Sequence, residues 1–173
     1  VGSEMCIRDS LEYMHMDPLF RGPNHGRLTF SLQYAYSENF IQVLSHDEVV
    51  HGKGSMINKM PGELDDKFAN LRTAYGFMYG HPGKKLLFMG QEFAQFREWS
   101  EARSLDWNLL GEEKNHQMQD YVKALNKLYQ EYDALYTNDS DPIGFEWMSC
   151  ENADMSVVTS VSYTHLTLPT IRL

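Results

Sequence analysis

Two short apolar runs on either side of a long amphipathic segment constrain the fold of this chain more than any other feature. Phe40–Leu44 and Lys85–Met89 are short and rich in strand-forming residues, so both are expected to be buried strands. Between them, apolar residues recur at steps of three and four from Glu63 until Pro82, which predicts an amphipathic helix over residues 63–80. A strand, a helix and a strand in this order predict a parallel sheet in an α/β fold.

Two more helices and a long irregular segment surround this unit. Residues 28–36 predict a short helix, and residues 116–135 predict a long amphipathic helix whose apolar stripe lies in the core. The segment before that long helix, residues 91–113, carries Trp99 and Trp107. Its length and aromatic content predict a functional loop.

The pattern changes after residue 138. Residues 138–142 form a turn-rich hinge, and Phe145–Met148 and Met155–Val158 predict strands with no helix between them. A domain boundary is therefore expected near residue 141.

The two ends of the chain are predicted to derive from one DNA element read in opposite orientations. Met5–Ser10 can be encoded by ATG TGT ATA AGA GAC AG, and the reverse complement of that string encodes Val161–His165. The string looks like the transposon end of sequencing-library adapters. We therefore leave residues 1–10 and 161–173 out of the fold prediction and expect residues 11–160 to be an internal part of a longer protein. Native tails of unusual composition are the alternative.

Composition excludes several classes of function. A net charge of −9 argues against a nucleic-acid surface, which needs basic residues. The sequence has no apolar run near the ~20 residues that span a bilayer, so no membrane partner is expected. Outside the two ends, Cys150 is the one cysteine, which excludes a disulfide framework or a thiolate zinc site there and suits a reducing cytoplasm.

Polar residues follow each predicted strand. His46, Asp47 and Glu48 come after the first, and Gln91 and Glu92 come after the second. In parallel α/β folds, active sites collect beyond the C-terminal ends of the strands. A carboxylate there can stabilise positive charge that develops in a reacting sugar. From position alone, a capping or salt-bridging carboxylate is an equal alternative.

Metal-dependent and nucleophilic-serine sites fit poorly. His46, Glu48 and His51 form H-x-E-x-x-H, but a zincin needs Glu directly after the first His and the two His one helical turn apart. We therefore expect no metal. A G-x-S-x-G nucleophile elbow is absent from the sequence.

The sequence resembles glycogen branching enzymes, within the α-amylase superfamily (glycoside hydrolase family 13). The resemblance covers essentially residues 11–158, and its most specific parts are the His-Asp-Glu-Val-Val-His-Gly-Lys and Gly-Lys-Lys-Leu-Leu-Phe-Met-Gly blocks. The matching segments are Leu44–Lys53, Met60–Gly62, Lys67–Arg72, Pro82–Phe93, Arg97–Trp99, Ser104–Trp107 and Gly144–Trp147.

The resemblance implies a (β/α)₈ TIM barrel, of which residues 11–141 would form the last part, about strands seven and eight with helices six to eight. Phe40–Leu44 would be strand seven and Lys85–Met89 strand eight. Residues 142–160 would begin a C-terminal all-β domain, a β-sandwich. Asp47 would then stand at the catalytic end of the barrel.

The resemblance also implies a retaining transglycosylase that acts on α-glucan in the cytoplasm without a cofactor. Such an enzyme cleaves an α-1,4 bond through a covalent glycosyl-enzyme and transfers the chain to a sugar primary hydroxyl, which makes an α-1,6 branch. By matching position, Asp47 would be the third catalytic carboxylate, the transition-state stabiliser, and His46 would donate a hydrogen bond to the same sugar. The nucleophile and general acid would lie upstream, so this chain alone is expected to be inactive.

Other residues have two interpretations. Glu48, Gln91 and Glu92 are candidate substrate contacts, with loop support as the alternative. Trp99 and Trp107 could stack on sugar rings, but buried loop anchors are expected for both. Another hydrolase of the superfamily, or a non-catalytic glucan-binding homologue, remains the alternative to a branching enzyme.

Overall fold

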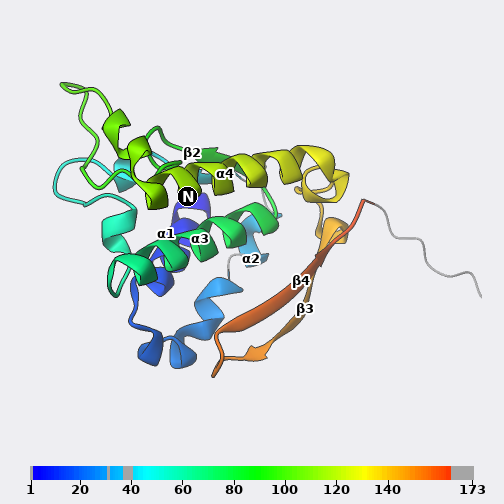
Figure 1. Cartoon of the computed structure of the whole chain (residues 1–173). Coiled ribbons are helices and arrows are strands. Elements are labelled where there is room, and N and C mark those ends of the chain that lie inside the picture. Colours follow the sequence, from blue (N-terminus) through cyan, green and yellow to red (C-terminus); the bar gives the residue numbers. More distant parts are fainter. Residues whose placement is uncertain (1, 31, 37–40, 165–173) are drawn as a thin grey trace, which may run out of the picture.

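In a computed structural model of the chain, the structure describes residues 2–30, 32–36 and 41–164. They form a mixed arrangement of helices and strands in which α3 packs against both α1 and α4, and an antiparallel hairpin lies to one side (Figure 1). Among the described residues, no helix is long and apolar enough to cross a membrane.

Strands β1 (Ile41–Leu44) and β2 (Lys84–Leu87) pair in parallel, with Ile41 opposite Lys84 and Leu44 opposite Leu87. The predicted parallel pair is thus confirmed. The expectation that β2 is buried is wrong: all its residues are exposed or half-buried, and Leu86 is 42% exposed. Within the described residues, β2 pairs with β1 on one edge and has no strand on the other. Phe40 lies outside the described residues.

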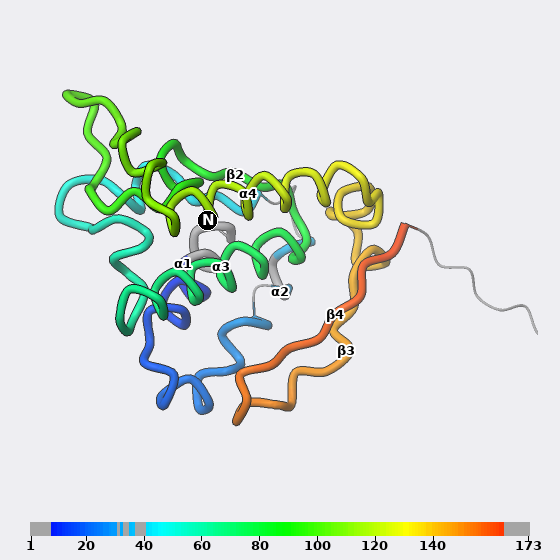
Figure 2. Tube along the Cα trace, viewed as in Figure 1, coloured from blue at the N-terminus to red at the C-terminus, as the bar shows by residue number. Residues whose placement is uncertain are grey.

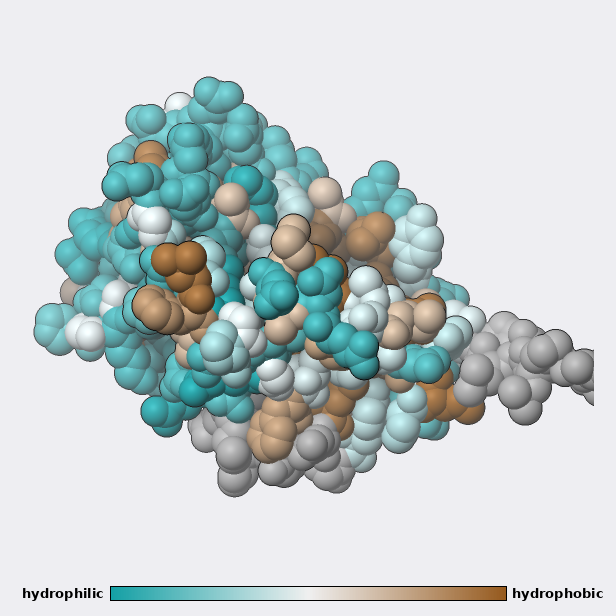
Figure 3. Space-filling view, turned by 90° about the horizontal axis from the view of Figure 1, so that it is seen from below, coloured by the Kyte–Doolittle hydropathy of each residue, from teal (hydrophilic) through white to brown (hydrophobic). Residues whose placement is uncertain are grey.

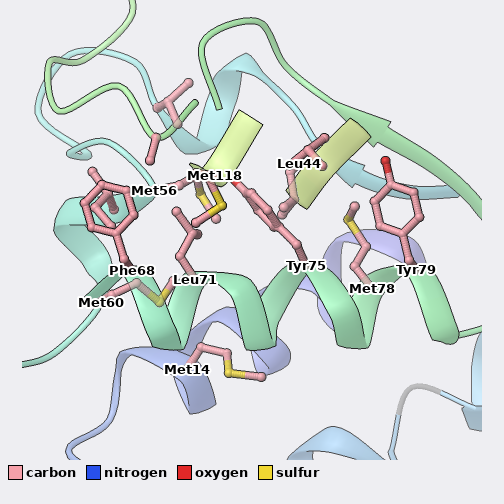
Figure 4. Packing of buried hydrophobic residues seen from close by; sticks show 14 of the residues in the cluster. Met14, Leu44, Met56, Met60, Phe68, Leu71, Tyr75, Met78, Tyr79 and Met118 are labelled. Atoms are coloured by element: carbon pink, nitrogen blue, oxygen red, sulfur yellow. The ribbon is translucent and has the colours of Figure 1, made fainter. Parts of the chain in front are cut away.

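Helix α3 (Leu64–Gly80) confirms the predicted central helix. Its N-terminus is a capping box, in which Glu63 and Asp66 each accept the other's backbone N–H through their side chains. Gly62 precedes it at φ 87°, where a Cβ would lie 2.6 Å from the Cβ of Asp66. One face of α3 fills the core, as Figure 4 shows, with the buried residues Phe68, Leu71, Tyr75, Met78 and Tyr79.

Helix α4 (Glu113–Glu131) confirms the second long helix but ends earlier than predicted, before a 3-10 turn over Asp133–Leu135. Met118 and Val122 are buried in the core, as expected. Two residues depart from the expected core stripe. Tyr132 is 57% exposed, because the helix has already ended there, and Leu128, near the end of the helix, is 45% exposed.

The N-terminal part differs most from the prediction. Residues 28–36 are not one helix, since Leu28 ends the 3-10 helix Gly22–Leu28 and α2 covers Leu32–Ala35. Helix α1 (Gly2–His15) has no counterpart in the prediction, which leaves residues 1–10 out. The conformation of these residues does not test how their codons arose, so that origin stays a prediction.

Strands β3 (Phe145–Asn152) and β4 (Val157–Ser162) form an antiparallel hairpin and confirm the two predicted strands. The hairpin packs against the C-terminal end of α3, where Trp147 stacks on Phe77 with ring centroids 6.4 Å apart. A 3-10 turn over Pro142–Gly144 precedes it. That a domain boundary lies there remains a prediction.

Candidate functional site

Asp47 lies in one 3-10 turn, His46–Glu48, directly beyond the C-terminal end of β1. Ser45 caps this turn, since its Oγ accepts the N–H of Asp47 at 3.3 Å. The side chains of Asp47 and His46 are 67% and 54% exposed, and Asp47 Oδ1 lies 3.2 Å from His46 Nε2. The turn therefore presents a carboxylate and an imidazole together to the outside.

Aromatic residues from the neighbouring loop pack against His46. Its ring centroid lies 5.9 Å from that of Phe88 and 6.5 Å from that of Trp99, and these two rings meet edge to face. Trp99 is half-buried against the core, as expected of a loop anchor. The same expectation is wrong for Trp107, which packs on Phe93 but is 53% exposed, because it lies in a surface 3-10 turn.

Gln91 and Glu92 follow β2, and their side chains bond to backbone at the end of β1 and in the turn after β2. Gln91 is 4% exposed, and its Nε2 donates to the carbonyl of Leu44 at 3.2 Å. The hydroxyl of Tyr75 donates to the carbonyl of Gln91 at 3.1 Å, and burial raises the pKa of Tyr75, which keeps this donor protonated. Glu92 Oε2 accepts the N–H of Gly90 at 2.7 Å. Both side chains thus make contacts that fix the loop after β2.

Glu48 lines a groove together with Lys53, Lys59 and Arg27, and residues of α1 form its other wall. The Lys59 ammonium donates to the carbonyl of Lys53 at 2.5 Å. Burial lowers the pKa of Lys59, and the negative charge of Glu48 partly opposes this shift. Glu48 therefore contributes charge to a largely basic groove.

Glu98, which was not predicted to have a role, connects the loop between β1 and α3 to the loop that follows β2. Its carboxylate accepts the backbone N–H groups of Gly52 and Gly54, and His51 Nδ1 lies 3.7 Å from its Oε2. The sequence signal for this contact is small: two glycines beside a histidine in the first loop, and a carboxylate in the second. In Figure 2 the two loops, in cyan and green, lie at the same end of the molecule.

The histidines do not gather around a common point. His46 contacts Asp47, whereas His51 lies beside Glu98. Within the part of the chain that the structure describes, no group of three or more His, Cys, Asp or Glu side chains is arranged to hold a metal ion.

Comparison with known proteins gives a consistent set of relatives. No protein-family profile matches the chain. The chain is 56% identical over 152 residues to the 1,4-alpha-glucan branching enzyme GlgB of Shewanella frigidimarina, and the aligned residues make up 88% of this chain and 20% of that protein. It is 58% identical over 152 residues to the GlgB of Roseobacter denitrificans, covering 88% of this chain and 21% of the relative.

A third relative, the GlgB of Novosphingobium aromaticivorans, is 54% identical over 151 residues, or 87% of this chain and 21% of that protein. The chain thus spans about a fifth of the length of the curated relatives that it matches. Over nearly nine-tenths of its own length, this chain is homologous to one segment of the much longer 1,4-alpha-glucan branching enzymes named GlgB.

Proposed function

We propose that this chain is part of a 1,4-alpha-glucan branching enzyme, which cleaves an α-1,4-glucan and transfers the released chain to a sugar primary hydroxyl. The identity of 54–58% to proteins of that name is the observation that carries the proposal. The α-glucan is the proposed partner, the cytoplasm the proposed location, and no cofactor is required. Alone, the chain lacks the nucleophile and general acid and is inactive.

The proposed architecture is the last part of a (β/α)₈ barrel in residues 11–141, followed by the start of a β-sandwich in residues 142–160. The parallel β1–β2 pair with α3 as its crossover supports the barrel. Exposed apolar residues on and after the strands also support it, because the remaining strands and helices of a barrel would cover them. Ile41 and Met89 are 44% and 52% exposed. Apolar patches also interrupt the hydrophilic face in Figure 3.

In the proposed mechanism Asp47 is the third catalytic carboxylate. Its exposed, negatively charged side chain beyond β1 stabilises the oxocarbenium-like transition state and holds the hydroxyls of the reacting sugar. His46 donates a hydrogen bond to the same sugar from beside Asp47. One preorganised interaction of this kind contributes roughly 3–4 kcal/mol to transition-state stabilisation.

The remaining candidates have supporting roles in this proposal. The contacts of Gln91 with the end of β1 and of Glu92 with the turn after β2 favour loop support over direct contact with glucan. Glu48 stays a candidate substrate contact, because it lines an open groove beside the Asp47 turn.

A graft tests the function. Residues 11–160 replace the matching segment of the GlgB of Shewanella frigidimarina, and branching is followed by the absorbance of the iodine–amylose complex. We expect the graft to branch amylose, and Asp47→Ala to lower its activity about 100- to 1000-fold without unfolding it. Asp120→Ala, which removes a 61% exposed carboxylate from α4, is the matched control.

Each outcome has a distinct meaning. A folded graft that releases reducing ends without making branch points would indicate a hydrolase, and a folded graft with neither activity would contradict the enzyme proposal. Full activity in the Asp47→Ala graft would overturn the role of that carboxylate alone.

A further inference from the structure

The loop between β1 and α3 has little regular structure of its own, although it carries Asp47. Two of its glycines adopt left-handed backbone conformations, with φ of 85° at Gly52 and 75° at Gly54. Their backbone N–H groups donate hydrogen bonds to the Glu98 carboxylate. Gly52 donates to Oε1 and Oε2 at 3.0 and 3.1 Å, and Gly54 donates to Oε1 at 2.7 Å. A side chain 46 residues away in sequence from Gly52 thus holds this turn.

The residues beside Glu98 extend the connection toward Asp47. The N–H of Trp99 donates to the carbonyl of Val49 at 3.0 Å, and the N–H of Val49 donates to the carbonyl of His46 at 2.9 Å. The second bond closes the 3-10 turn that contains Asp47. A continuous series of hydrogen bonds therefore joins the segment of Glu98 and Trp99 to the catalytic turn.

The charge of Glu98 suits this task. Its pKa is lowered, first by the hydrogen bond from Gly54 and then by that from Gly52, so the group is a carboxylate near neutral pH. Hydrogen bonds from backbone N–H to an ionised carboxylate are stronger than neutral ones. Both oxygens are already occupied by backbone donors, which leaves Glu98 a holder of the loop rather than an acid for the reaction.

We propose that Glu98 is a positioning residue for glucan transfer: its carboxylate clamps the Gly52–Gly54 turn and thereby fixes Asp47 and His46 in the orientation that the transition state needs. This inference rests on the proposed function, since it concerns the same site. It assigns Glu98 an effect on the chemical step rather than on glucan binding.

The graft described above allows a direct test with Glu98→Ala and Glu98→Gln. Misplacement of a catalytic group by about 1 Å can cost on the order of 100-fold in rate, so we expect kcat to fall roughly 10- to 100-fold in Glu98→Ala with KM changed less than about twofold. Glu98→Gln keeps one acceptor oxygen and should recover part of that loss. Glu101→Ala, an exposed carboxylate in the same loop, is the matched control.

Amide hydrogen exchange of Gly52 and Gly54 provides a readout that does not depend on activity. Exchange at both should accelerate in Glu98→Ala and stay unchanged in Glu101→Ala. Unchanged exchange, or a kcat equal to that of the control, would overturn the clamp. An inactive parent graft whose Gly52 and Gly54 amides are protected by Glu98 would instead refute the proposed function and leave the clamp standing as a structural contact.

Discussion

The turns that directly follow the two parallel strands differ in exposure. After β1, His46 and Asp47 expose more than half of each side chain. After β2, Phe93 and Gln91 are 0% and 4% exposed. The start of the first loop thus presents polar groups to the outside, whereas the turn after β2 is buried. Farther along the first loop the chain is buried as well, at Met56 and Ile57. Exposed polar groups fix one another weakly, because water competes for their hydrogen bonds, so the buried contacts of the second turn add rigidity to the first.

The largest effect should come from removing the packing of the second loop. Phe93→Ala empties a fully buried site, which costs about 3–5 kcal/mol in the free energy of unfolding. Asp47→Ala, in the exposed loop, should change that free energy by less than about 0.5 kcal/mol. Urea-dependent pulse proteolysis of the graft measures both values. Equal losses in the two variants would remove the distinction between the loops.

At the opposite end of the strands, the buried His81 makes the free energy of unfolding depend on pH. His81 is 2% exposed, and its Nδ1 lies 2.8 Å from Gln42 Nε2 and 3.0 Å from the carbonyl oxygen of Pro82. Burial lowers the pKa of His81 from 6.5 to about 4. The unfolded state therefore takes up this proton first as the pH falls. The contribution of the neutral His81 to the free energy of unfolding is fully present above pH 6.5. It is lost as the pH falls toward 4, by on the order of 3 kcal/mol.

Unfolding midpoints at several pH values between 7 and 4 would record this loss, since the window is set by the two pKa values of His81. His81→Gln should flatten that part of the profile. A wild-type midpoint that does not change over the window would contradict the neutral buried imidazole.

A smaller effect is expected inside the exposed loop itself. Gly52→Ala keeps the N–H donor to Glu98, and the new Cβ meets nothing within 4 Å, so its cost is that of an alanine at φ 85°, about 1–2 kcal/mol. Gly111→Ala, equally open but without a left-handed φ, is the control. The difference between the two midpoints measures the backbone cost, and no difference would show that the turn relaxes freely.

The smallest effect should follow from Gln91→Leu. This change loses the bond to Leu44, while Gln91 Oε1 has no partner among the described residues, so we expect a loss of about 1 kcal/mol. If Gln91 supports the loop, KM for amylose in the graft stays constant. A several-fold rise in KM with unchanged stability would restore Gln91 as a substrate contact.

Sequence periodicity predicts the elements whose pattern is local. The helix at α3 and the parallel pairing of β1 with β2 follow from apolar spacing and from the order of the elements. The exposure of β2 could not be predicted, because it depends on which strands lie beside it. The division of residues 28–36 between a 3-10 helix and a short α-helix could not be predicted for another reason: the mixed apolar spacing of this segment fits either kind of helix.

The candidate site divides in the same way. The position of Asp47 directly beyond a strand could be predicted from its place after an apolar run. The contact of Glu98 with Gly52 and Gly54 could not, because it is long-range and involves backbone donors that leave no side-chain pattern in the sequence.

This contact also sets an order of events during synthesis. Residues 46–54 leave the ribosome well before Glu98, which follows Gly52 by 46 positions. Until β2 and the segment after it have been translated, no Glu98 carboxylate is there to accept hydrogen bonds from the N–H groups of Gly52 and Gly54. Closing so long a loop also carries an entropic cost. The part of the chain that presents Asp47 is therefore translated early but acquires its final shape late.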